Sequence, residues 1–141
     1  MIEFFDTNVM VAAFLSSHEH HENSRLRIKD LSPERSYCAA HSLAEVYAVT
    51  TRLPRRPTVP PEDVFLFLQD IQARLTPVTL DAPDYLAVLA QLRNDRFTGG
   101  RVYDALLLHC ARKANAQRIY TFNLRDFQRL APDLADRMST P

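Results

Sequence analysis

Short apolar runs alternate with longer amphipathic segments along this chain. The runs carry apolar residues at neighbouring positions, which is typical of strands buried on both faces of a sheet. The longer segments repeat their apolar residues at i, i+3 and i+4, the spacing of one helix face. The runs predict strands over residues 2–5, 37–40, 78–80 and 119–121. The segments predict helices over residues 8–15, 24–31, 41–53, 62–75, 82–93 and 102–114, and a short helix or turn over 123–130.

Two of the predicted helices carry well-marked apolar stripes. A stripe of this kind is the face that a helix normally packs against a core. In the helix over 41–53 the stripe consists of Leu43, Val46, Tyr47, Thr50 and Leu53. In the helix over 82–93 it consists of Tyr85, Leu86, Leu89 and Leu92.

The alternation of strands and helices predicts an α/β fold, a three-layer α/β/α sandwich around a mostly parallel central sheet. With 141 residues, 46% of them apolar, the chain is expected to form a single domain over residues 1–141. No apolar run approaches the length of a membrane span, and residues 1–6 lack the basic segment of a signal peptide. We therefore expect a cytoplasmic protein with no membrane partner.

Glycine, cysteine and charge exclude several functions. The only glycines are Gly99 and Gly100, so neither a P-loop nor a dinucleotide-binding glycine motif can be formed. Cys38 and Cys110 lie far apart in apolar segments and are expected to be buried, reduced thiols. The formal net charge is zero, so any binding of nucleic acid must come from a local basic patch.

Acidic and amide side chains follow the predicted strands. Asp6 ends the first strand, Glu45 comes one turn into the helix after the second, and Asn123 and Asp126 follow the fourth. Asp104 lies in the first turn of the apolar helix that leads into that fourth strand. Because sites in parallel α/β sheets form at the carboxyl ends of the strands, we expect these residues to converge.

Each acid also has a purely structural interpretation. Asp6 and Asp104 could cap helices, Glu45 could be exposed or paired with an arginine, and Asp126 could belong to a turn. However, Glu45 is the only charged residue between His41 and Arg52, and Asp104 is the only one between Arg101 and Arg112 apart from the possible charge on His109. A carboxylate buried among apolar residues is costly unless a cation meets it.

Converging carboxylates repel one another and raise each other's pKa unless a cation is bound. Oxygen ligands suit Mg²⁺ or Mn²⁺ rather than Zn²⁺. A hard divalent ion of this kind can activate water and position it for attack on a phosphodiester. The pattern therefore points to metal-dependent phosphodiester hydrolysis without a covalent protein nucleophile.

The motifs around these acids resemble those of the PIN-domain family across nearly the whole chain. The motifs are Phe4-Phe5-Asp6-Thr7-Asn8-Val9, Ser42-Leu43-Ala44-Glu45-Val46-Tyr47, Val102-Tyr103-Asp104-Ala105-Leu106 and Thr121-Phe122-Asn123-Leu124-Arg125-Asp126-Phe127. In size and single-domain build the chain is similar to the VapC-type toxins of bacterial toxin–antitoxin pairs. The resemblance implies an endoribonuclease that binds Mg²⁺ or Mn²⁺ through Asp6, Glu45 and Asp104.

The resemblance also implies further site residues and partners. Many relatives carry an acid where this chain has Asn123, so either Asp126 supplies the fourth carboxylate or Asn123 acts as a neutral ligand. Thr7 and Asn8 are expected to steady Asp6 by hydrogen bonds. The family further implies a homodimer, an RNA substrate and a VapB-like antitoxin that blocks the acidic groove.

Other functions remain open at this point. The chain could be an RNA-processing nuclease without an antitoxin, or an inactive PIN-like module that only binds. Haloacid-dehalogenase-type phosphatases need a second acid where Asn8 stands, and receiver domains need paired acids near the first strand and a lysine that is missing here. Candidate contacts to RNA or to a partner are the arginines Arg52, Arg55, Arg56, Arg93, Arg96 and Arg101.

Overall fold

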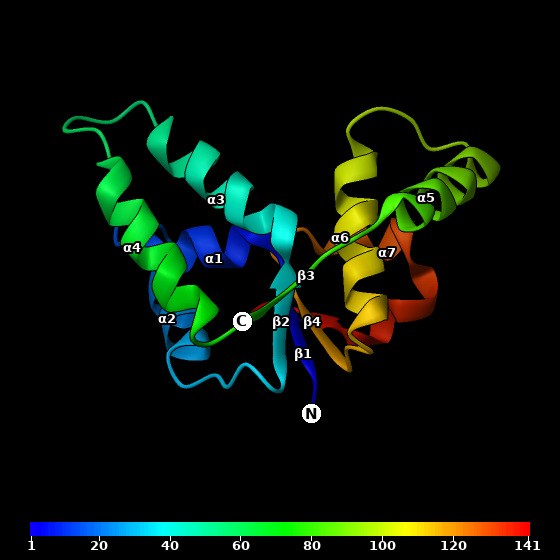
Figure 1. Ribbon diagram of the computed structural model, residues 1–141, viewed down its shortest axis with the longest axis horizontal. Helices are drawn as coiled ribbons and strands as arrows, with labels where there is room; N and C mark the ends of the chain where they lie inside the picture. Colours follow the sequence, from blue (N-terminus) through cyan, green and yellow to red (C-terminus); the bar gives the residue numbers. More distant parts are fainter.

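In the computed structural model, which describes residues 1–141, five parallel strands form one sheet with helices on both faces (Figure 1). The predicted α/β class and parallel sheet are confirmed. The strands are β1 (Glu3–Phe5), β2 (Ser36–Ala39), β3 (Thr76–Val78), β4 (Arg118–Tyr120) and β5 (Met138–Ser139). The helices are α1 (Thr7–Phe14), α2 (His21–Ile28), α3 (Ala40–Thr51), α4 (Pro61–Gln72), α5 (Ala82–Asp95), α6 (Arg101–Lys113) and α7 (Leu124–Leu130), followed by the 3-10 helix η1 (Pro132–Arg137).

Every predicted strand and helix is present, with ends shifted by a few residues. The largest shifts are at α2, which begins at His21 and ends at Ile28, and at α4, which ends at Gln72. The sequence patterns gave no indication of η1 or β5, because a 3-10 turn and a two-residue strand are too short to show a period.

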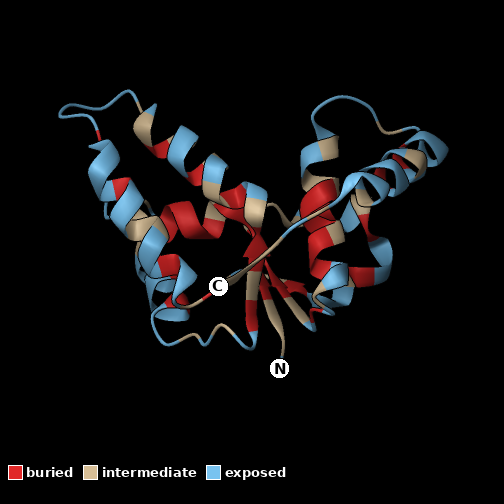
Figure 2. Cartoon of the chain, in the orientation of Figure 1, coloured by how far each residue is buried: buried red, intermediate tan, exposed pale blue.

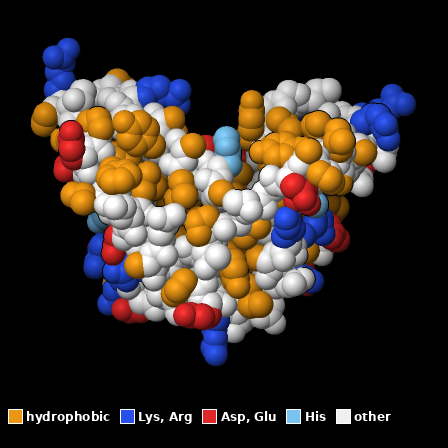
Figure 3. All heavy atoms as spheres, in the orientation of Figure 1, with side chains coloured by type: hydrophobic (Ala, Val, Ile, Leu, Met, Phe, Trp, Pro, Cys, Tyr) orange, Lys and Arg blue, Asp and Glu red, His pale blue; other side chains and the backbone are white.

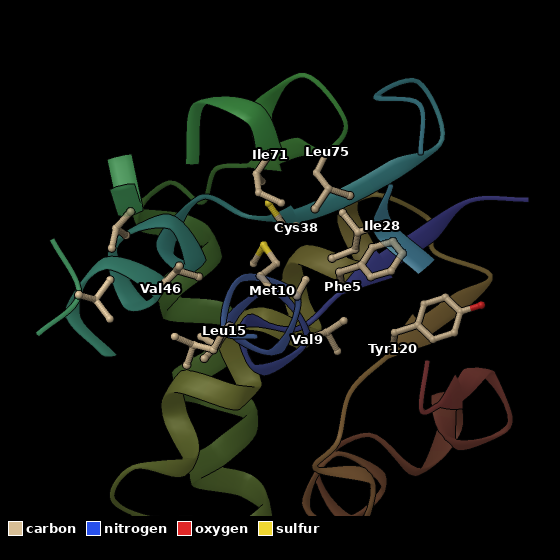
Figure 4. Close-up of a cluster of buried hydrophobic side chains, with 14 residues drawn as sticks. Phe5, Val9, Met10, Leu15, Ile28, Cys38, Val46, Ile71, Leu75 and Tyr120 are labelled. Atoms are coloured by element: carbon tan, nitrogen blue, oxygen red, sulfur yellow. The ribbon is translucent and has the colours of Figure 1, made fainter. Parts of the chain in front are cut away.

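The inner strands β1, β2 and β4 are mostly buried on both faces, which explains their apolar runs, whereas the edge strand β3 is only partly buried. Successive side chains of a strand point to opposite faces, so Phe5 and Tyr120 pack with α1 to α4, while Phe4 and Ile119 pack with α6 and α7. The rings of Phe5 and Tyr120 stack with centroids 5.1 Å apart (Figure 4). Buried residues accordingly gather along the sheet and on the inner sides of the helices (Figure 2).

The strand order β3-β2-β1-β4-β5 places β1 at the centre of the sheet. From β1 the chain builds outward on one side through β2 and β3, and it returns on the other side of β1 with β4 and β5. Ligand sites of such sheets lie where the strand order reverses, here between β1 and β4. Because Phe5 is in register with Tyr120, residues 6 and 121 leave the sheet side by side.

The two predicted apolar stripes are only partly correct. On α3, Val46 and Thr50 are buried, but Tyr47 is exposed. On α5, Val88 and Leu92 are buried, whereas the other predicted stripe residues, Tyr85, Leu86 and Leu89, are exposed. The reason is that α5 packs mainly on α6, so that only a narrow part of its surface meets the core.

Two further sequence expectations concern thiols and membrane spans. Cys38 and Cys110 are both buried and free, as predicted. Burial raises the pKa of the Cys38 thiol to about 12, so this side chain stays protonated at neutral pH. None of the helices combines the length and the apolar character that crossing a bilayer requires.

The helices at the carboxyl edge of the sheet diverge into two arms. One arm is formed by α3 and α4, and the other by α5 and α6 (Figure 1). The space-filling view shows a hollow between the arms, with a histidine side chain at its floor (Figure 3).

Candidate functional site

Asp6 follows β1 directly and is only 5% exposed. Its Oδ2 accepts a hydrogen bond of 2.7 Å from the Thr121 hydroxyl, across the junction of β1 and β4. Asp6 occupies the position before α1, but its side chain makes no capping hydrogen bond. A capping role therefore does not account for this buried carboxylate.

Burial raises the pKa of Asp6 from 3.8 to about 7. The hydrogen bond from Thr121 opposes this rise because it stabilises the charged form, and the backbone N–H of Thr7 acts in the same direction. The negative charges of Asp104 and Glu45 raise the pKa further. The charges of both other predicted site acids thus act on the pKa of Asp6.

Glu45 lies in the second turn of α3, and its side chain is 32% exposed. Its Oε1 is buried and accepts no hydrogen bond. His41, one turn earlier, holds Nε2 3.4 Å from this oxygen, which is within ion-pair range but lacks hydrogen-bond geometry. A buried acceptor without a donor costs about 1–3 kcal/mol, so this oxygen is suited to receive a cation or a water.

Asp104 is half-buried in the first turn of α6. Burial raises its pKa, and the charges of Asp126 and Glu45 raise it further. The Asn123 amide opposes the rise, since Nδ2 donates to Asp104 Oδ2 at 3.3 Å. Like Asp6, Asp104 makes no capping hydrogen bond, because the helix already begins at Arg101 after Gly100.

The segment after β4 links two of the acids. The backbone N–H of Asn123 donates to the Thr121 hydroxyl oxygen at 2.9 Å, and that hydroxyl in turn donates to Asp6. The Asn123 side chain reaches Asp104 at the same time. Asp126 is exposed on α7 and lines a small surface hollow with Arg101. Of the two candidates for the fourth position, Asn123 is therefore the one that contacts another acid.

The hydrogen bonds predicted from the side chains of Thr7 and Asn8 to Asp6 are absent. Thr7 instead donates to Ser42 Oγ at 2.8 Å, which ties the start of α1 to the start of α3. Asn8 Oδ1 accepts from the backbone N–H of Phe122 at 3.4 Å. Both side chains thus hold neighbouring segments in place, and Thr121 supports Asp6 because it leaves the sheet beside it.

Sequence reasoning missed Thr121, Ser42 and His41 as parts of this site. Thr121 stands in the fourth motif, but its contact with Asp6 follows only from the pairing of β1 with β4, which no local pattern specifies. Ser42 is fully buried, and its role becomes visible only through its contact with Thr7. His41 carried no motif, and its relevance comes from its approach to Glu45.

The donor set fits a hydrated hard cation. No three His, Cys, Asp or Glu side chains stand close enough to hold an ion by themselves. Mg²⁺, however, commonly binds through one or two carboxylates and keeps water as its other ligands. No Lys or Arg forms an ion pair with Asp6, Glu45 or Asp104. A bound cation would compensate both the Glu45 oxygen that accepts no hydrogen bond and the buried Asp6 carboxyl group, whose pKa is raised.

Comparison with known proteins identifies the family of this chain. The family model described as PIN domain matches residues 4–132. The chain belongs to the PIN domain family. This PIN domain is also 36% identical over 120 residues to Ribonuclease VapC40 of Mycobacterium tuberculosis, and the match covers 85% of each chain.

Solved structures show the same fold. VapC20 of Mycobacterium tuberculosis, described as a sarcin-ricin loop cleaving toxin, superposes with a TM-score of 0.66 at 17% identity, covering 86% of this PIN domain and 89% of that chain. VapBC2 of Rickettsia felis, solved bound to a DNA fragment from its promoter, gives a TM-score of 0.66 at 22% identity, covering 99% and 98%.

The candidate arginines of this PIN domain do not form one patch. Arg52 directly follows the last residue of α3, and Arg55 and Arg56 lie in the loop that leads to α4. Arg101 begins α6, which belongs to the opposite arm (Figure 1). Its guanidinium lies 5.0 Å from the centre of the Phe97 ring. The remaining two, Arg93 and Arg96, lie at the end of α5. The cations therefore flank the hollow from two sides.

Proposed function

We propose that this PIN domain is an endoribonuclease that depends on Mg²⁺ or Mn²⁺ and acts as the toxin of a toxin–antitoxin pair. The observation that carries the proposal is the group Asp6, Glu45 and Asp104 at the crevice between β1 and β4. The charges of Asp104 and Glu45 raise the pKa of Asp6, the charge of Glu45 raises that of Asp104, and none of the three acids has a Lys or Arg partner. The resemblance to a ribonuclease over 85% of the chain supports RNA as the substrate.

Each residue of the site has a distinct task in this proposal. Asp6, Glu45 and Asp104 would hold the ion, partly through bound water molecules, and the ion when bound would supply a Lewis acid and a more acidic water. Thr121 fixes the orientation of Asp6 by donating to Oδ2, and Asn123 does the same for Asp104. Such supporting hydrogen bonds to ligating carboxylates tune the affinity of a metal site.

The reaction needs one water and no covalent intermediate with the protein. The water oxygen forms a bond to phosphorus, one P–O ester bond of the RNA breaks, and the leaving oxygen gains a proton. With its pKa near 7, Asp6 is partly protonated at neutral pH. Binding of a cation would displace this proton from the Asp6 carboxyl. Asp126, exposed beside Arg101, stays a candidate for the fourth catalytic acid.

Partner chains are the second part of the proposal. We infer a homodimer and a VapB-like antitoxin that covers the acidic hollow. Exposed apolar side chains support the presence of partners, since monomeric proteins rarely show large apolar patches. They include Phe65 and Leu66 on α4 and Leu86 and Leu89 on α5.

Cleavage of RNA with and without a divalent cation tests the enzyme. Wild type should cleave single-stranded RNA with Mg²⁺ or Mn²⁺ and lose this activity in EDTA. Asp6→Asn and Asp104→Asn should abolish cleavage while the circular dichroism spectrum stays unchanged, and Asp136→Asn, at an exposed position of η1, should remain active. Cleavage retained in both site variants would refute the assignment. Binding of RNA without cleavage by wild type would indicate a module that only binds.

Binding of Mn²⁺, measured by calorimetry, adds a readout that does not depend on turnover. Wild type should bind the ion with release of protons, and Asp6→Asn should bind it at least about tenfold more weakly. Co-purification with the product of an adjacent small gene, together with loss of RNA cleavage in that complex, tests the antitoxin. An unchanged cleavage rate in the complex would contradict inhibition at this site.

A further inference from the structure

Two exposed aromatic rings face each other beside the carboxylates. His41 lies in the first turn of α3 and Tyr103 lies on α6, so the rings come from the two opposite arms. Their planes are inclined by only 8°, and their centroids are 6.2 Å apart. The rings are stacked in parallel even though 55% of Tyr103 and 47% of the His41 side chain are accessible to solvent.

The position of this pair ties it to the reacting centre. His41 Nε2 is 3.4 Å from Glu45 Oε1, and Tyr103 directly precedes Asp104. A phosphodiester held at the carboxylates would thus carry its neighbouring nucleotides past both rings. Substrate RNA presents flat aromatic bases in single-stranded regions, and proteins commonly hold such bases by stacking on Tyr or His.

The surface beside His41 also has room for a small planar group. His41 lines a cavity of about 220 Å³, together with Thr79, Leu80 and Tyr85. This volume is below the roughly 300–1,000 Å³ that is typical of pockets for drug-sized ligands. Its lining is mostly apolar, as suits the face of a single base rather than a phosphate.

We propose that an unpaired RNA base next to the scissile phosphate stacks on the Tyr103–His41 pair and that this contact selects single-stranded substrate. The inference rests on the proposed nuclease function and adds the feature of the substrate that the site recognises. Stacking tolerates any base, so the pair favours unpaired RNA over duplex rather than one sequence over another. Tyr103 is a positioning residue here, and the carboxylates remain the groups that perform the chemistry.

Tyr103→Leu removes the ring at an exposed position, and Tyr103→Phe keeps it. With an RNA whose cleavage site has been mapped, Tyr103→Leu should raise KM between about 5- and 150-fold and leave kcat within about twofold, whereas Tyr103→Phe should behave like wild type. Removing the base next to the cleavage site should raise KM for wild type and not for Tyr103→Leu.

A binding assay separates this inference from the nuclease proposal. The probe is a single-stranded RNA that carries 2-aminopurine beside the cleavage site, or at each position in turn if wild type does not cleave. Its fluorescence should fall when it binds wild type in EDTA. The fluorescence should not fall when it binds Tyr103→Leu. If this quenching occurs and no metal cleaves the RNA, the nuclease proposal fails while the stacking site stands. If wild type cleaves RNA and Tyr103→Leu changes neither quenching nor KM, the stacking site is refuted. It is also refuted if Tyr103→Leu weakens only the binding of a protein partner.

Discussion

At the level of single residues, Asp6 shows how the site opposes the stability of the fold. A buried carboxylate whose pKa is raised to about 7 favours the protonated form in the folded state. Between the usual value near 3.8 and about 7, the folded chain binds more protons than the unfolded chain. The free energy of unfolding must therefore fall as pH rises through this range, unless a cation occupies the site.

Asp6→Asn should consequently stabilise the metal-free protein. The substitution removes the charge and keeps an oxygen that can accept from Thr121. We expect the gain in the free energy of unfolding to grow by about 1–3 kcal/mol between pH 5 and pH 8. Urea unfolding in EDTA at the two pH values measures this gain, with Asp136→Asn as the exposed control. A gain that is equal at both pH values would show that Asp6 is not the cause.

The Thr121 hydroxyl provides a second test at this level. Thr121→Val removes the donor to Asp6 with little change of volume, and Thr121→Ser retains it. Loss of the hydrogen bond should weaken Mn²⁺ binding by about 10- to 100-fold in the valine variant, while the serine variant stays near wild type. Calorimetric titration with Mn²⁺ distinguishes the two. Equal affinities in both variants would mean that the hydroxyl does not orient Asp6.

At the level of elements, the sequence predicted the positions of strands well and the contacts between them poorly. An apolar run must stop where a strand leaves the sheet, so the position of Asp6 after the first run was predictable from the sequence alone. Its partner Thr121 was not, because that contact depends on the register of strands separated by more than 100 residues. The same limit applies to α5, whose helical period was clear but whose buried side was set by α6.

The docking of α5 on α6 depends on Asp84 in a way that the sequence did not reveal. Asp84 completes a capping box with Asp81 at the start of α5. It also accepts from Lys113 Nζ at 2.9 Å and lies 3.1 Å from His109 Nε2, both on α6. These contacts, above all that of Lys113, hold the pKa of Asp84 well below its usual value.

Asp84→Asn should therefore destabilise the protein at neutral pH. The folded-state pKa is depressed, so the contribution is fully present above the unfolded value near 3.8 and is lost as pH falls below it. Thermal melting should show a lower midpoint for Asp84→Asn at pH 7, with the difference shrinking toward pH 3. Asp95→Asn, on the same helix, loses only an interaction with Gln91 and serves as the control. A difference in melting midpoint that is as large at pH 3 as at pH 7 would contradict stabilisation by the Asp84 charge.

At the level of the whole molecule, a neutral chain has to bind a polyanion through local charge. The formal net charge is zero, so there is no overall attraction that would draw RNA to the surface. The two arms instead present arginines at their tips, on either side of the hollow that holds the carboxylates (Figure 3). An RNA strand that extends from the site in both directions would thus pass from the carboxylates in the hollow to the arginines on either side, which can contact its backbone phosphates.

This arrangement predicts how RNA affinity depends on salt. Each phosphate contact to single-stranded RNA contributes about 0.7 to the slope of log K against log salt concentration. Replacing Arg52, Arg55 and Arg56 by Ala should therefore reduce the slope by up to about 2, when binding is measured in EDTA to prevent cleavage. The same charge change at Arg25, Lys29 and Arg35, which are exposed cations on and after α2, should leave the slope unchanged.

The comparison of the two triple variants decides whether the tip of the α3–α4 arm contacts RNA. Both variants carry the same net charge, so any general electrostatic effect cancels between them. A lower salt-dependence slope only in the variant with Arg52, Arg55 and Arg56 replaced would assign phosphate contacts to this loop. Equal slopes would mean that RNA leaves the hollow by another route. Affinity of wild type that does not change between low and moderate salt would exclude phosphate contacts by either arm, because counterion release accompanies each such contact.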